Sequence, residues 1–130
     1  TAPHEDYVLQ KSGGDMSGNL GLKTYSETIG TTPATIGTVT FDIETGTVFE
    51  LTPTGAVTIG FENWCESGVA GSVTVRLKNG ASVYAKTFAA AIKWPDNEIP
   101  DLSAANKAYD LVFSSIDGGT VIHGACVGPY

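Results

Sequence analysis

The stretch TVTFDIETGTVFELTPTGAVTIGF, residues 38–61, decides the fold because one pattern recurs along it. In its first part, Val39, Phe41 and Ile43 fall on one side of an extended chain, and polar residues lie between them. Alternation with a period of two, in β-branched and aromatic residues, is typical of a strand with one buried face. The stretch therefore predicts short β-strands rather than helices.

The same alternation continues on both sides of this stretch and predicts a wholly β domain. The predicted strands are residues 38–43, 48–52, 56–61, 72–78, 82–88, 108–114 and 120–126. The predicted turns between strands are ETG at 44–46, PTG at 53–55, NG at 79–80 and DGG at 117–119. Asn-Gly and Asp-Gly favour tight hairpins. We therefore expect an antiparallel, jelly-roll-like β-sandwich over residues 25–130.

Composition limits the functions open to this chain. It has 130 residues, a length that suits one domain, and a formal net charge of −7. Arg76 is its only arginine and the lysines are scattered, so no basic stripe is present to bind nucleic acid or an anionic membrane. No apolar run approaches the roughly 18 residues of a membrane span, and we expect no membrane insertion.

The spacing of cysteine and histidine argues against a metal centre. Cys65 and Cys126 lie far apart, and neither a CxxC nor an HxxxH spacing occurs. We expect two free thiols, no metal and no cofactor. His123 falls in a predicted strand without a nucleophile at a recognisable spacing, so we also expect no catalysis.

Residues 1–24 form a segment of a different kind. The stretch KSGGDMSGNLGL, residues 11–22, contains four glycines and few apolar side chains. It offers too little apolar area to become ordered alone, so it must pack against its own β domain or against another copy of the chain. A phosphate-binding loop would end in Gly-Lys-Ser/Thr, whereas here Lys11 precedes the glycines.

Three stretches of the chain resemble fibre proteins of tailed bacteriophages. GGDMSGNLGL, residues 13–22, is similar to the GGxMxGxLxL segment that recurs in tail fibres. IGTVTFDIETGTVFELTPTGAVTIGFEN, residues 36–63, resembles a fibre β-domain in which a Thr-Gly turn leads to a second strand. AAIKWPDNEIPDLSAANKAYDLVFSSIDGGTVIHG, residues 90–124, resembles the end of the same domain. The resemblance extends roughly from Lys11 to the C-terminus.

This resemblance implies a homotrimeric structural protein on the virion surface, on tail or head, made in the host cytoplasm. It implies attachment to the host surface as a tail-fibre-like protein and contact with other virion proteins, with a head fibre or capsid decoration protein as the alternative. The N-terminal segment would then form a trimer seam. The seam residues are Gly13, Gly14, Met16, Gly18, Leu20 and Leu22. In the competing interpretation the segment is a loop packed on its own domain.

Two loops are the candidates for receptor contact, with a bacterial surface glycan or protein as the partner. The candidate residues are Glu62, Asn63 and Trp64 in one loop and Asp96, Asn97 and Glu98 in the other. Aromatic side chains in loops supply contact area at a low entropic cost. We expect Trp94 to be a core residue or to cover a hairpin, whereas Trp64 either packs on the core or contacts the receptor.

Two further interpretations of these loops stay open. Glu62 and Glu66 flank Trp64 and could be the acid pair of a glycan-degrading enzyme at a fibre tip, provided that they lie about 5–10 Å apart. The acids of residues 96–101 could hold calcium, although they lack the EF-hand spacing. We expect surface acids in both places. A cell-surface lectin-like module is the remaining alternative.

Overall fold

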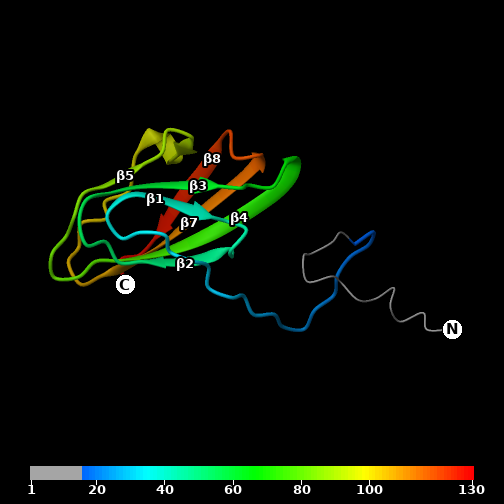
Figure 1. The fold of residues 1–130 in the computed structure, drawn as a ribbon, viewed down its shortest axis with the longest axis horizontal. Helices are drawn as coiled ribbons and strands as arrows, with labels where there is room; N and C mark the ends of the chain where they lie inside the picture. Colours follow the sequence, from blue (N-terminus) through cyan, green and yellow to red (C-terminus); the bar gives the residue numbers. More distant parts are fainter. Residues whose placement is uncertain (1–15) are drawn as a thin grey trace.

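The computed structural model describes residues 16–130 and contains two β-sheets stacked face to face, as Figure 1 shows. The described residues contain no α-helix and only one short 3-10 segment, η2 (Pro95–Asn97). The prediction of a two-sheet, all-β domain is therefore confirmed. Gly13 and Gly14 of the predicted seam lie outside the described residues.

One sheet has three strands and the other has five. The three-stranded sheet has the order β1-β3-β5, with β1 (Gly37–Asp42), β3 (Val57–Glu62) and β5 (Lys86–Phe88). The five-stranded sheet has the order β2-β4-β7-β8-β6, with β2 (Val48–Leu51), β4 (Ser67–Lys78), β7 (Ala108–Asp117), β8 (Ile122–Val127) and β6 (Ile92–Lys93). Every predicted strand overlaps an observed one, although β4 begins earlier than predicted and β5 is shorter.

The first six strands do not form hairpins, and this corrects the antiparallel, jelly-roll-like prediction. Each strand from β1 to β6 lies in the opposite sheet to the strand before it, so the chain winds around the core. Strands that meet after one turn of this winding are parallel, as in β1 with β3, β3 with β5 and β2 with β4. The turns at 44–46, 53–55 and 79–80 therefore cross from one sheet to the other. Alternation identifies a strand with a buried face, but it does not decide whether a turn reverses within a sheet or crosses the sandwich.

Only the turn at 117–119 forms the predicted hairpin. It joins β7 to β8, which are antiparallel neighbours. Gly118 and Gly119 have φ angles of +70° and +83°, which L side chains rarely adopt, so the Gly-Gly pair is required here. β7 also pairs antiparallel with β4, and the hairpin thereby completes the five-stranded sheet.

An aromatic cluster fills the space between the two sheets. Ring centroids lie 4.7 Å apart for Phe41 and Phe49, and 4.8 Å apart for Phe61 and Phe113. Trp94 is only 7% exposed and packs edge-on against Phe113 at 5.6 Å, which confirms that it is a core residue. Such rings bury large areas and orient one another, so this cluster holds the sheets together.

Residues 29–32 cover the outer edge of β2. Ile29 forms a parallel bridge with Val48, and the Gly30 amide donates to the Val48 carbonyl at 2.8 Å. A Cβ atom on Gly30 would lie 2.3 Å from the Phe49 ring, so only glycine fits this close approach. The hydroxyl of Thr32 donates to the Glu50 carbonyl at 2.6 Å. This short segment therefore takes the position of an edge strand beside β2, at the start of the winding.

Replacement of Phe113 by alanine should be strongly destabilising. The Phe113 ring is fully buried and contacts Phe61, Phe88 and Trp94, so its loss leaves a cavity at the centre of the cluster. We expect Phe113→Ala to lower the free energy of unfolding by about 3–5 kcal/mol, as measured by urea denaturation. The matched control on the same strand is Ile116→Ala, whose side chain is 70% exposed, and it should change the free energy by less than about 0.5 kcal/mol. Equal effects of the two changes would contradict this core assignment.

Candidate functional site

The loop after β3 brings one of the predicted contact groups to the surface. Glu62 and Asn63 are exposed, and the Asn63 amide donates to Asp42 Oδ1 at 3.0 Å. Together with the backbone amide of Glu44, this bond holds the pKa of Asp42 below its usual range. The Trp64 ring is half-buried against Phe61, with centroids 5.6 Å apart, so it packs on the core and presents only part of its surface. Receptor contact by this loop stays a prediction.

The second predicted contact group lies in η2 and the residue after it. Asp96, Asn97 and Glu98 are all exposed. The Asn97 amide donates to the Trp94 carbonyl at 3.0 Å, and the Glu98 amide donates to the Pro95 carbonyl at 3.1 Å. These bonds fix the segment to the buried Trp94. Figure 1 places η2, in yellow, well apart from the green loop between β3 and β4, so the fold does not join the two groups into one site.

Both groups contain backbone in the left-handed region. The φ angles are 62° at Asn63, 55° at Asp96 and 58° at Asn97. Such conformations are uncommon outside glycine, although Asn and Asp tolerate them best. Residues held in sparsely populated conformations concentrate at functional loops. Asn106, in the loop before β7, has the same geometry with a φ angle of 57°, so the two candidate loops share this feature with a third.

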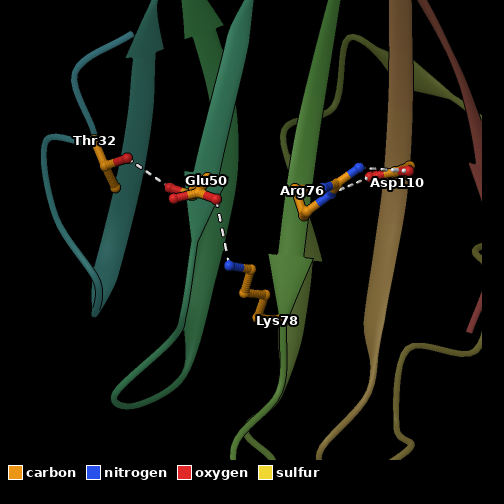
Figure 2. Close-up of polar contacts among 5 residues, drawn as sticks. All are labelled: Thr32, Glu50, Arg76, Lys78 and Asp110. Carbon is orange, nitrogen blue, oxygen red and sulfur yellow. Dashed lines mark hydrogen bonds and ion pairs between the residues drawn. The ribbon is translucent and has the colours of Figure 1, made fainter. Parts of the chain in front are cut away.

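The outer face of the five-stranded sheet carries a row of paired charges that the sequence analysis missed. Figure 2 shows Arg76 on β4 against Asp110 on β7, with Nε 2.9 Å from Oδ1 and Nη2 3.3 Å from Oδ2. Lys78 Nζ lies 3.3 Å from Glu50 Oε1 on β2. The Asp110 carboxylate raises the pKa of Arg76. Because the four charges neutralise one another, the row is a solvated polar surface rather than a site for one kind of ion.

A hollow of about 440 Å³ lies beside this row. Arg76, Lys78, Ala108, Asp110 and Tyr130 line it. Tyr130 is held there because its backbone amide and carbonyl both bond to Ala108. Alternation in the sequence predicts that Arg76 faces outward, but the register of β4 against β7 brings Asp110 opposite it. That register depends on tertiary pairing and leaves no signal in the local sequence.

The described part of the N-terminal segment exposes its apolar residues. Met16, Leu20 and Leu22 are 49%, 58% and 60% exposed, and Gly18 has open space around it. Figure 1 shows this blue segment leading away from the β domain. Glu27, near the end of this stretch, accepts a hydrogen bond from the Thr47 hydroxyl. Contact between copies of the chain and packing on the chain's own domain both stay predictions.

The reactive groups do not converge on a catalytic or metal site within residues 16–130. Cys65 and Cys126 are free thiols, as predicted, and burial raises the pKa of Cys126 with a smaller contribution from Asp110. No group of three His, Cys, Asp or Glu side chains lies close enough to hold a metal ion in this part of the chain. Nor does a helix long and apolar enough to cross a membrane occur among these residues.

Comparison of the chain with protein-family models, with curated proteins and with solved structures gives no match.

Asp117 fixes the hairpin next to Trp64, and its contribution to stability should depend on pH. Its Oδ1 accepts bonds from the Val121 amide at 3.0 Å and from the Ser115 hydroxyl at 2.9 Å, and these bonds lower its pKa. A carboxyl whose folded pKa is depressed stabilises the fold above its unfolded pKa of about 3.9 and loses that effect as the pH falls through the folded value. Asp117→Ala should therefore lower the urea midpoint at pH 7, and the difference from the wild type should shrink below about pH 4. A difference that stays constant from pH 7 to pH 3 would contradict this role.

Proposed function

We propose that this chain is a virion surface protein of a tailed bacteriophage that binds the host surface without chemical turnover. The observation that carries the proposal is the division of the molecule into two parts. The β domain presents polar loops and faces, whereas the N-terminal segment exposes Met16, Leu20 and Leu22 to solvent. A segment of this kind needs a partner to cover it, and the resemblance of residues 13–22 to phage fibres supports a second copy of the chain as that partner.

The proposed assembly is a homotrimer joined through residues 1–24. In such a trimer each copy makes the same heterologous contact with the next. The three contacts close a ring, so every copy has both of its contact surfaces covered. The three β domains then lie side by side and present their loops together. Binding through three linked domains can exceed the affinity of one domain by about 10²–10⁴-fold, which suits attachment to a repetitive surface.

The proposed receptor contacts are the exposed members of the two loops. Glu62 and Asn63 come from one loop and Asp96, Asn97 and Glu98 from the other. All are polar and accessible, and their carboxylate and amide groups can hydrogen-bond to sugar hydroxyls or to a protein surface. The left-handed backbone at three of these positions supports the assignment because uncommon conformations of this kind concentrate at functional loops.

Adhesion to cells tests this proposal. Fluorescently labelled protein, incubated with a panel of bacterial strains, should adhere to at least one strain and leave the mass of its extracted surface glycans unchanged. In the adherent strain Glu62→Ala and Glu98→Ala should each weaken adhesion severalfold, whereas Glu44→Ala, an exposed acid in the turn between β1 and β2, should not.

Two results would overturn the proposal. Lack of adhesion across the panel would contradict attachment. Shortening of the glycan by the wild type, lost in Glu62→Gln or Glu66→Gln, would favour the glycan-degrading enzyme instead.

A further inference from the structure

The outer edge of β1 has no strand partner among residues 16–130 along all six residues of the strand. β1 has only one hydrogen-bonded neighbour, β3, and the other edge strand of its sheet, β5, is three residues long. In the second sheet, residues 29–32 cover β2, and β6 has only two residues. A bare edge is a template for another strand, and β1 lacks the proline, bulge or lysine that usually blocks one.

The groups that face this open edge can be assigned from the ladder. The Gly37 amide donates to the Ala56 carbonyl at 2.8 Å, and the Ile43 amide donates to the Glu62 carbonyl at 3.2 Å. In a parallel pair every second residue bonds to a given neighbour. The amide and carbonyl groups of Thr38 and Thr40 therefore point away from β3 and toward the open edge.

We infer that residues 18–23 of a second copy of this chain add to the edge of β1 as a parallel strand. The inference rests on the proposed self-association and specifies what the N-terminal segment contacts: the neighbouring β domain, rather than the equivalent residues of its neighbours. It does not depend on attachment to the host.

The alternation of the segment selects the register, because the spacing between paired strands varies along the winding. It is nineteen positions for Ile29 with Val48 and twenty for β1 with β3. A spacing of nineteen places Leu20 opposite Val39 and Leu22 opposite Phe41, whereas a spacing of twenty would turn both leucines away from the core. Both leucines then continue the buried rows in which Val39 lies beside Ile59 and Phe41 beside Phe61. Leu20 and Leu22 alternate with Asn19 and Gly21, as a strand with one buried face requires.

Charge supports the same register. It places Lys23 opposite Asp42, and Asp42 already lies opposite Glu62 on β3. Two acids side by side on neighbouring strands repel each other, whereas a lysine on the third strand would attract both. The bonds from Asn63 and from the Glu44 amide both reach Asp42 Oδ1, so Oδ2 remains free for an ammonium group.

The path of the N-terminal segment favours pairing with β1 of a second copy over pairing with β1 of the same chain. Residues 16–26 lead away from the body in Figure 1, and Tyr25 is 77% exposed. Pairing within one chain would require this stretch to cross from one sheet to the other, as the connections between β1 and β6 do, and the path that the structure has does not make that crossing. When copies exchange this segment, it keeps the extended path seen in the structure. Such a domain swap makes the same strand contacts as pairing within one chain, at a low cost in free energy.

A cysteine pair across the proposed edge tests the inference. The register places Asn19 opposite Thr38, both exposed. Neighbouring strands lie about 4.7–4.9 Å apart, so two cysteines directly opposite each other are near enough for a disulfide after a small adjustment. In a background of Cys65→Ser and Cys126→Ser, Asn19→Cys with Thr38→Cys should give covalent oligomers up to a trimer on a non-reducing gel. The matched control is Asn19→Cys with Thr87→Cys, on β5 at the far edge of the same face, and it should give none.

Each other outcome has a separate meaning. A disulfide formed within one chain would overturn the exchange between copies, and bond formation that is equal in the control pair would overturn the register. No bond, while light scattering still reports a trimer, would overturn the edge pairing and leave the proposed trimer intact. A ladder that stops at the dimer would support strand exchange and contradict the threefold assembly.

Discussion

The contact between the aromatic rings of the two sheets is the constraint on which the rest of this structure depends. Phe41 and Phe61 come from one sheet, Phe49 and Phe113 from the other, and their rings meet between the sheets. Because consecutive strands from β1 to β6 lie in opposite sheets, no pair among them is held by a local hairpin. The strands keep their places only because each contributes to this shared core or pairs with a strand one turn away. A chain built this way folds through contacts distant in sequence, which form more slowly than local ones.

Because the chain winds around the core, the first strand of each sheet has an open edge, which hairpin connections would not leave in this way. A wound chain adds strands at one edge of each sheet, so its first strands remain open until earlier residues cover them. Residues 29–32 cover β2 in the five-stranded sheet. In the three-stranded sheet, no strand among residues 16–130 covers β1. The segment whose alternation matches this edge is residues 18–23, which leads away from the body. The proposal for assembly thus arises from this feature of the fold.

Much of this architecture could be predicted from the sequence, but its connectivity could not. Alternation at Val39 and Phe41 and at Phe49 and Leu51 identified the buried faces, since all four side chains are buried. The DGG turn identified its hairpin because its glycines require positive φ angles, whereas the Thr-Gly turns carry no comparable constraint and cross the sandwich. The same limit applies to the candidate sites. Loop composition indicated Asn63 and Asp96, but the pairing of Arg76 with Asp110 depends on the register of β4 and β7, which local sequence does not encode.

Amide hydrogen exchange in β1, followed residue by residue by NMR, tests the central claim most directly. The Val39 and Phe41 amides face β3 and should be protected in every state of the protein. The Thr38 and Thr40 amides should be protected in the wild type, where a second copy's strand covers the edge, and should exchange at least tenfold faster in Leu20→Asp/Leu22→Asp, where that strand cannot dock. Equal exchange of Thr38 and Thr40 in the two proteins would show that residues 18–23 do not occupy this edge and would contradict the account.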